Sequence, residues 1–223
     1  MLKIENVEVL GWEHAIRGMR NPKNSWEKSD SGVKCPYEKE NCCGECQQNF
    51  CIGPNDYTLM MQLRNAGTDH RKFMRMIAVY VDITAPLYWW KEFDTYKVGT
   101  VANSCSTMHK IADKRFERED FSIEHLENCD EQHWMVCMEN IISSLNVARE
   151  KYLETKDKKY WWQMIQLLPS SYNQRRTVML NYEVLANMYK SRRHHKLDEW
   201  HTFCDWVEAL PYSELIVGKE ADK

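Results

Sequence analysis

Hydrophobic and polar positions follow strand-like and helix-like periods in separate stretches of the chain. Residues 2–11 alternate apolar and polar side chains, which is typical of a half-buried strand, and the β-branched stretch 77–84 predicts a second strand. A third strand is predicted for residues 175–180. Helical patterns cover residues 56–67, 87–93 and 182–193. Separated strands and helices without an internal repeat favour an α+β domain.

Two further helices are predicted from the spacing of their apolar residues. The first is long and amphipathic, because its apolar residues recur at three- and four-residue steps: Trp134, Cys137, Met138, Ile141, Leu145, Ala148 and Tyr152. The inner face of the second, near the end of the chain, consists of Trp200, Phe203, Cys204 and Val207. We expect Asn55 and Asn181 to cap helices, and Pro86 to end a strand and begin a helix.

Residues 21–54 break the periodic pattern and predict a long loop or insertion, rich in Pro, Gly, Ser, Asn and Cys. Five cysteines lie close together in it, and two of them form a CxxC: Cys35, Cys42, Cys43, Cys46 and Cys51. Thiolates at this spacing can converge on Zn²⁺, although no second CxxC is present. A structural zinc site, a redox-sensitive pair and reduced cysteines in a surface insertion all remain open.

Composition limits the class of protein. The 223 residues, 43% of them apolar, suit one folded domain over 1–223 with the cysteine-rich insertion at about 21–54. A net charge of −3 and a pI near 6.3 provide no basic field for nucleic acid, so no nucleic acid partner is expected. No signal peptide or membrane span is visible, and we expect a cytoplasmic protein.

The glycine pattern disfavours two large enzyme classes. The chain has 8 glycines but neither GxGxxG nor GxxxxGK[ST], which disfavours dinucleotide-binding and P-loop folds. A GxSxG hydrolase motif is also absent.

Two polar clusters are the candidate sites. In residues 91–106, Lys91 and Lys97 can meet phosphate oxygens, Asn103 can read a base edge, and Tyr96 can stack on a planar ring. In residues 181–195, Asn181 begins a helix and Arg192 lies three turns later. Basic residues at a helix C-terminus are also favoured by the helix dipole alone, so a purely structural role stays open.

The order of motifs resembles that of the flavin-dependent thymidylate synthases (ThyX). The stretch "DHRKF", a strand and then "APLYWWKEF" is similar to the family's "EH…F", a strand and "AP", with Lys91-Glu92 at its Arg-Gln. Downstream, the family's "LP", an Asn twelve residues after that Pro and an Arg eleven residues later match Leu168-Pro169, Asn181 and Arg192. The start "VEVLG…AIRGMR" is similar to the family's opening, so the resemblance spans most of the chain outside the insertion.

The resemblance implies a fold and a chemistry. The fold is an antiparallel sheet flanked by helices, assembled as a homotetramer, and the chemistry is methylation of a dUMP-type pyrimidine nucleotide, or related chemistry at C5, with FAD and a folate. Nucleotide contacts are then expected from Arg192, Lys97, Lys91, Glu92 and Asn103, and flavin contacts from His70, Tyr96, Lys97 and Asn181. Cys105 or Ser106 would lie near the pyrimidine ring as the catalytic residue, with Cys105 a nucleophile toward C6.

One family signature is changed in this chain. The family has Arg-His-Arg, seven residues and then Ser, whereas the same register here holds Thr95-Tyr96-Lys97 and then Cys105, with Ser106 one residue further on. Two hypotheses follow: a divergent flavin-dependent enzyme acting on a pyrimidine nucleotide, and a catalytically inactive nucleotide-binding protein with the same fold. In a third, weaker hypothesis the cysteine insertion is a zinc-stabilised contact surface for a partner.

Overall fold

The computed structural model describes residues 2–32, 50–130 and 132–218, which form two compact units. Unit 1 comprises the described residues within Met1–Ile4, Asp82–Thr95 and Asn103–Thr177. Unit 2 comprises those within Glu5–Val81, Tyr96–Ala102 and Val178–Lys223. Each unit is described by itself below.

The strands form an antiparallel four-stranded sheet in the order β1-β2-β4-β3, and the chain has an α+β fold. The strands are β1 (Lys3–Leu10), β2 (Ala78–Pro86), β3 (Val101–Ser104) and β4 (Asn173–Asn181). The alternation in β2 buries Val79, Val81 and Ile83, while Tyr80 stays exposed, as expected for a strand with one face on the core. β3 was not predicted because all four of its residues are exposed and show no alternation.

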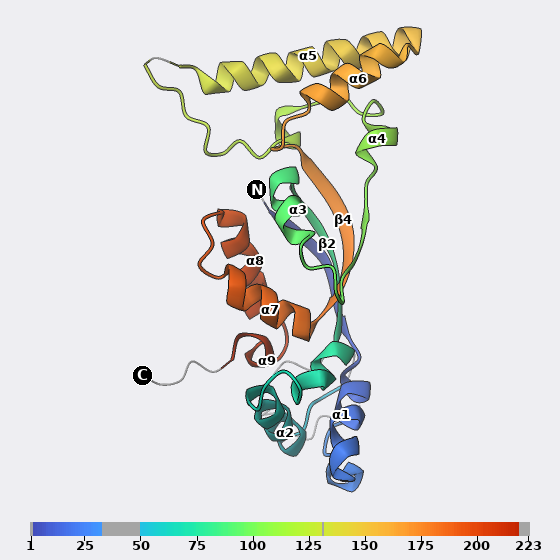
Figure 1. Ribbon diagram of the computed structural model, residues 1–223, viewed down its shortest axis with the longest axis vertical. Coiled ribbons are helices and arrows are strands. Elements are labelled where there is room, and N and C mark those ends of the chain that lie inside the picture. The colour runs from blue at the N-terminus through green and yellow to red at the C-terminus, as the bar shows by residue number, and fades with distance from the viewer. Residues whose placement is uncertain (1, 33–49, 131, 219–223) are drawn as a thin grey trace. The chain divides into compact units, whose positions relative to one another are not determined.

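In unit 2, helix α7 is packed against several neighbours (Figure 1). The helical elements of this unit are α1 (Trp12–Arg20), α2 (Pro54–Asn65), the 3₁₀ helix η4 (Arg71–Met76), α7 (Tyr182–Arg192), α8 (Asp198–Glu208) and α9 (Glu214–Val217), with short 3₁₀ turns at Asn21–Lys23 and Trp26–Lys28. α7 contacts η4, α8 and α9. The predicted inner face of α8 is confirmed, because Trp200, Phe203, Cys204 and Val207 are all 0% exposed.

In unit 1, α5 (Trp134–Thr155) and α6 (Lys158–Leu167) pack side by side (Figure 1). The unit also contains α3 (Leu87–Phe93), α4 (Thr107–Lys110) and a short 3₁₀ turn, Arg118–Asp120. The core of the unit is formed by Ile111, Ala112, Phe116, Phe121, Met138, Leu145, Ala148 and Met164. The predicted long helix is therefore confirmed, although its first two predicted core residues, Trp134 and Cys137, are exposed.

Helix α2 starts differently from the prediction. Asn55 is not its cap, because the helix begins at Pro54 and no side chain of the neighbouring sequence caps it. The carboxylate of Asp30 instead accepts hydrogen bonds from the backbone N–H groups of Asn55 and Asp56, at 2.9 and 3.1 Å. A residue within the insertion thus satisfies free N–H groups of the first turn.

Among the described residues, no helix combines the length and the apolar character that crossing a bilayer requires.

Candidate functional site

The predicted site residues divide between the two units. Unit 1 holds Lys91, Glu92, Asn103, Cys105 and Ser106, and unit 2 holds His70, Tyr96, Lys97, Asn181 and Arg192.

In unit 2, Arg192 is the last residue of α7 and lies against two aromatic rings. Its guanidinium carbon is 4.9 Å from the ring centroid of Trp200 and 5.5 Å from that of Tyr96. Its Nε donates a 2.9 Å hydrogen bond to the Tyr96 hydroxyl. Trp200 is fully buried, so it holds the guanidinium plane on a fixed surface. The structure therefore brings together two of the predicted site residues, Arg192 and Tyr96.

The loop that carries Tyr96 and Lys97 also lies against the first turn of α7. Asn181 caps this helix as predicted, since its side-chain oxygen accepts a 3.0 Å hydrogen bond from the Val184 backbone. Gly99 has a φ of +79°, and a Cβ there would lie 3.1 Å from Asn181 Nδ2 and 3.0 Å from a Val184 methyl. Only glycine combines this conformation with so close an approach. Asn181 is thus placed beside the loop that the motif register identifies.

Two polar groups of this loop have no partner among the described residues. The ammonium of Lys97 is exposed, and no carboxylate within the described ranges pairs with it. The hydroxyl of Thr100 is shielded from solvent yet makes no hydrogen bond with any described group. Buried polar groups are normally satisfied, so this hydroxyl is suited to a ligand or an ordered water.

A basic cavity of about 1040 Å³ lies along α7 in unit 2. Helix α7 and the residues that follow it provide one wall, and the segment on either side of His70 provides another; the main polar residues are Arg64, Thr68, Arg71, Asn187, Lys190, Arg193, His194 and Glu208. His70 is exposed. It precedes the cavity residue Arg71 in the sequence but does not itself line the cavity. The sequence analysis did not single out Arg64, Arg71, Asn187 or Lys190. Asn187, Lys190 and His194 recur at helical spacing, and this recurrence is the feature of the sequence that could have indicated a polar helix face.

Several cations of the cavity are already engaged. Arg71 pairs with Glu183 at 2.9 Å and donates to Asn187 at 3.2 Å. Arg64 donates to the carbonyl oxygens of Leu215 and Ile216, which lie at the end of α9. Lys190 and His194, in contrast, have no side-chain partner among the described residues. The ammonium of Lys190 therefore leaves positive charge in the cavity that none of the described residues neutralises.

Part of the cavity lining is a hydrogen-bonded pair, the phenol of Tyr189 and the carboxylate of Glu208. The Tyr189 hydroxyl donates to Glu208 at 2.6 Å, and Arg193 pairs with both Asp205, at 2.7 Å, and Glu208, at 3.3 Å. Burial, the hydrogen bond to Glu208 and the charge of that carboxylate raise the pKa of Tyr189 to about 12. Tyr189 is therefore a neutral hydrogen-bond donor at physiological pH.

In unit 1, the backbone around Cys105 is tied to β4 while its thiol is exposed. The Cys105 N–H donates to the Arg175 carbonyl, and the Cys105 carbonyl accepts from the Gln174 side chain, both at 3.0 Å. Cys105 is a free cysteine, and Asn103 is exposed on β3. The thiol is thus presented at a fixed position at the end of the strand.

Ser106 has a local structural role. Its hydroxyl accepts a 3.1 Å hydrogen bond from the His109 backbone and caps α4. Lys91 is exposed on α3, and the carbonyl of Glu92 accepts a 2.7 Å hydrogen bond from the Thr95 hydroxyl. Thr95, at the position of the first arginine of the family signature, therefore helps to end α3.

The sequence analysis also missed an arginine on β4. The guanidinium of Arg176 lies 4.2 Å from the ring centroid of Trp90 and pairs with Asp94 at 2.7 Å. Its Nε donates to Gln174 at 2.9 Å. The available signal was the pair Arg175-Arg176 inside a strand pattern, because charged residues in a central strand need partners.

The zinc prediction lies mostly outside the described residues, which do not include Cys35, Cys42, Cys43 or Cys46. Cys51 is buried and disulfide-bonded, and a sulfur in a disulfide is not a thiolate that binds zinc. No group of three or more His, Cys, Asp or Glu that could hold a metal ion occurs within the described ranges.

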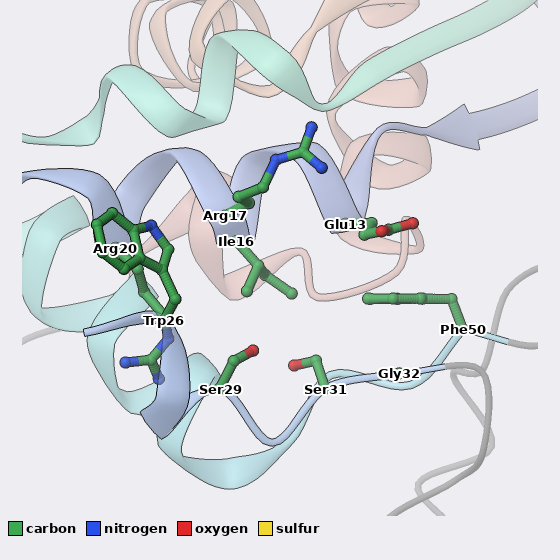
Figure 2. Close-up of a pocket in the computed structure, with 9 residues that line it drawn as sticks. All are labelled: Glu13, Ile16, Arg17, Arg20, Trp26, Ser29, Ser31, Gly32 and Phe50. Carbon is green, nitrogen blue, oxygen red and sulfur yellow. The ribbon is translucent and has the colours of Figure 1, made fainter. Parts of the chain in front are cut away.

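Figure 2 shows a smaller cavity, of about 310 Å³, between α1 and the segment that follows it. Trp26 and Phe50 lie on opposite sides of this cavity, with Ile16 between them. Ser29 and Ser31 form its polar edge.

Arg20 also reaches this cavity, but its guanidinium is occupied. Its Nε donates to Asp56 at 2.6 Å, and its two terminal nitrogens donate to the carbonyl oxygens of Ser25 and Lys28, both at 3.1 Å. Arg20 is therefore a structural residue that holds the loop after α1.

The strand order and the helices of the chain define an α+β protein with the fold of the flavin-dependent thymidylate synthases, as the motif resemblance predicts. In particular, the chain is similar to ThyX from Helicobacter pylori, whose structure was solved with FAD and dUMP. The match has a TM-score of 0.67 and 15% identity, over 97% of this chain and 98% of that one. It is also similar to the UMP/dUMP methylase PolB from Streptomyces cacaoi, bound with 5-Br UMP, with a TM-score of 0.57 and 14% identity over 96% and 93% of the two chains. Neither a scan of protein-family models nor a search of curated proteins finds a match.

Proposed function

We propose that this chain is a divergent flavin-dependent enzyme that acts on a pyrimidine nucleotide of the dUMP type, by methylation or related chemistry at C5. The observation that carries the proposal is the guanidinium of Arg192, stacked between Tyr96 and Trp200 at the position where the motif spacing matches without a gap. A stacked guanidinium keeps its fork in one plane, which suits bidentate contacts to a pyrimidine carbonyl or a phosphate.

The proposed role of unit 2 also includes the flavin. The positive cavity along α7, with Lys190 and His194 unpaired among the described residues, fits a pyrophosphate group. Asn181 and Lys97 lie in the segments that border this helix, and His70 precedes the cavity residue Arg71. A bound flavin would supply hydride transfer, and these side chains would bind and orient it.

In unit 1, the proposed role of Cys105 is that of a nucleophile toward C6 of the pyrimidine. Its exposed thiol and its fixed backbone suit this role. Lys91, Glu92 and Asn103 are proposed nucleotide contacts on the same unit. A folate as second substrate and a homotetramer complete the proposal, and size-exclusion chromatography with light scattering tests the assembly.

The alternative function is a catalytically inactive nucleotide-binding protein. It is favoured by Thr95 and Ser106, whose hydroxyl groups are used to end α3 and to cap α4. In that case the protein binds the nucleotide but is colourless after purification, because bound flavin would make it yellow.

The test is calorimetric titration with dUMP, UMP and dCMP. We expect Arg192→Lys to weaken binding by about tenfold or more, because a lysine does not reproduce the planar fork. Arg75→Lys is the matched control, since Arg75 is an exposed arginine of the same unit and lines neither of its two described cavities. Equal nucleotide affinities of Arg192→Lys and the wild type, or no binding by the wild type, would contradict the proposal.

A further inference from the structure

A second candidate site lies in unit 1, where α4, α5 and α6 surround a cavity of about 670 Å³. The cavity is lined by Met108, His109, Ile111, Ala112, Tyr152, Lys156, Lys158 and Trp161. Ile111 and Ala112 are buried and form its apolar floor, while Tyr152 and Trp161 are half-buried aromatic walls. A cavity of this size with aromatic walls can hold one planar ring system.

The walls of this cavity are held by hydrogen bonds across the unit. The indole N–H of Trp161 donates to the Met108 carbonyl at 2.9 Å, which joins α6 to α4. The Nε of Arg149, on α5, donates to the Ala112 carbonyl at 2.9 Å. The first bond positions the Trp161 wall and the second ties α5 to the floor before any ligand arrives, so less conformational entropy is lost when a ligand binds.

The connection between α5 and α6 places two lysines at the cavity. Lys156 ends α5 in the left-handed conformation, with φ 57°, and its ammonium lies 5.7 Å from the Tyr152 ring centroid. The ammonium of Lys158 lies 6.0 Å from the Trp161 ring centroid. Both cations therefore lie beside the aromatic walls.

Charge pairing around the cavity is uneven. The nearby carboxylates pair with other cations: Asp113 with Lys110, Asp157 with Lys159, Glu154 with Lys151, and Glu150 with Arg115. Lys156 and Lys158, in contrast, have no carboxylate partner among the described residues, and no acidic residue lines the cavity. The surface thus neutralises its other charges and leaves two ammonium groups and the His109 imidazole around an apolar floor.

We propose that this cavity binds a planar ring that carries a phosphate or a carboxylate group. The ring lies between Tyr152 and Trp161, and the anionic group is held by Lys156 and Lys158, with His109 as a further donor. A pyrimidine mononucleotide and a folate share this chemistry. With the nucleotide as ligand, the inference rests on the proposed function and adds a second binding site for the nucleotide, whose lining shares no residue with the site around Arg192.

The test compares ligands that differ in their charge and in their ring. Calorimetric titration uses the full-length protein with dUMP, deoxyuridine, folic acid and inorganic phosphate. We expect dUMP or folic acid to bind at least about tenfold more tightly than deoxyuridine and phosphate, since both parts of the ligand are recognised. Lys158→Gln should weaken the binding of whichever of these two ligands binds tightly by about tenfold. Lys151→Gln is the control, because it removes an equal charge from α5 at a residue that pairs with Glu154 and does not line the cavity.

The comparison of dUMP with folic acid shows which ligand the cavity binds. The comparison of Lys158→Gln with Arg192→Lys separates this inference from the proposed function. A loss of affinity for folic acid but not dUMP in Lys158→Gln supports the cavity with a folate as its ligand. A loss for dUMP in Lys158→Gln but not in Arg192→Lys supports the cavity and contradicts the role of Arg192. Affinities for both ligands that stay unchanged in Lys158→Gln and Lys156→Gln overturn the inference, whatever Arg192→Lys does. Thermal melting of each variant checks the fold, which exposed lysines should not alter.

Discussion

The replacement of Asp56 should cost unit 2 much of its stability. Its side chain is fully buried and accepts hydrogen bonds from Arg20 at 2.6 Å and from the hydroxyl groups of Ser29 and Ser31, both at 2.7 Å. The backbone N–H groups of Asp30 and Ser31 add two more, at 3.0 and 3.1 Å. One carboxylate thus holds the whole loop that forms the polar edge of the cavity in Figure 2.

We expect Asp56→Asn to lower the free energy of unfolding by about 3–5 kcal/mol at pH 7, because it leaves the buried Arg20 guanidinium without a counter-ion. Chemical denaturation with urea measures this loss. Glu27→Gln is the matched control, since Glu27 is an exposed carboxylate in the same loop and has no partner among the described residues. A second variant that also replaces Arg20 with Met should lose less than the sum of the single changes, because no uncompensated charge remains.

The depressed pKa of Asp56 also predicts that the stability of the protein depends on pH. Burial by itself would raise the pKa of Asp56, but the hydrogen bonds from Ser31, Ser29, Arg20 and the Asp30 backbone together hold this pKa below 3.8. Because the folded-state pKa is depressed, its contribution to stability is present above the unfolded-state pKa of about 3.9 and is lost as the pH falls through the folded-state pKa. Asp56→Asn should lack this acid-sensitive component. A change below about 1 kcal/mol at pH 7, or an acid unfolding curve parallel to that of the wild type, would refute the reasoning.

Three further predictions concern other parts of the chain. Gly99→Ala should destabilise the protein by about 1–3 kcal/mol, because φ is +79° and the new methyl would meet Asn181, and a thermal melt equal to that of the wild type would contradict this. Burial raises the pKa of Cys204 to about 11, whereas Cys105 is exposed. Iodoacetamide at pH 8 should therefore modify Cys105 and leave Cys204 unmodified until the protein unfolds, which peptide mass spectrometry measures. If the insertion binds zinc, elemental analysis of protein prepared without chelator should find one equivalent of zinc, and Cys43→Ser should lower this zinc content. Finding no metal would leave the insertion an ordinary loop.

Features that depend on neighbouring residues could be predicted from the sequence. The alternation in β2 and the buried face of α8 follow from local periods of two and about 3.6 residues, which a single segment displays by itself. The spacing from Pro169 through Asn181 to Arg192 runs along β4 and α7 without interruption. It therefore indicated both the helix cap and the resemblance in fold.

Helix α6 and strand β3 were both missed, for different reasons. In α6, Trp161, Met164 and Ile165 recur at helical spacing and pack on the core, so its signal was present but was masked by the exposed apolar residues Trp162 and Leu167. β3 has no buried residue at all. This strand depends on its pairing partner rather than on a pattern of its own.

By itself, the sequence determined strands β1, β2 and β4, helices α2, α3, α5, α7 and α8, the cap at Asn181 and the fold family that the motifs resemble. Only the tertiary structure decided which distant side chains meet: Arg20 with Asp56, Asp30 with the start of α2, and Arg192 with Tyr96, 96 residues away. The cavity between α4, α5 and α6 also belongs to this second group, because its walls are separated along the chain. Periodicity reports which face of a segment is buried, whereas ion pairs, rings and cavities depend on how the segments pack against one another.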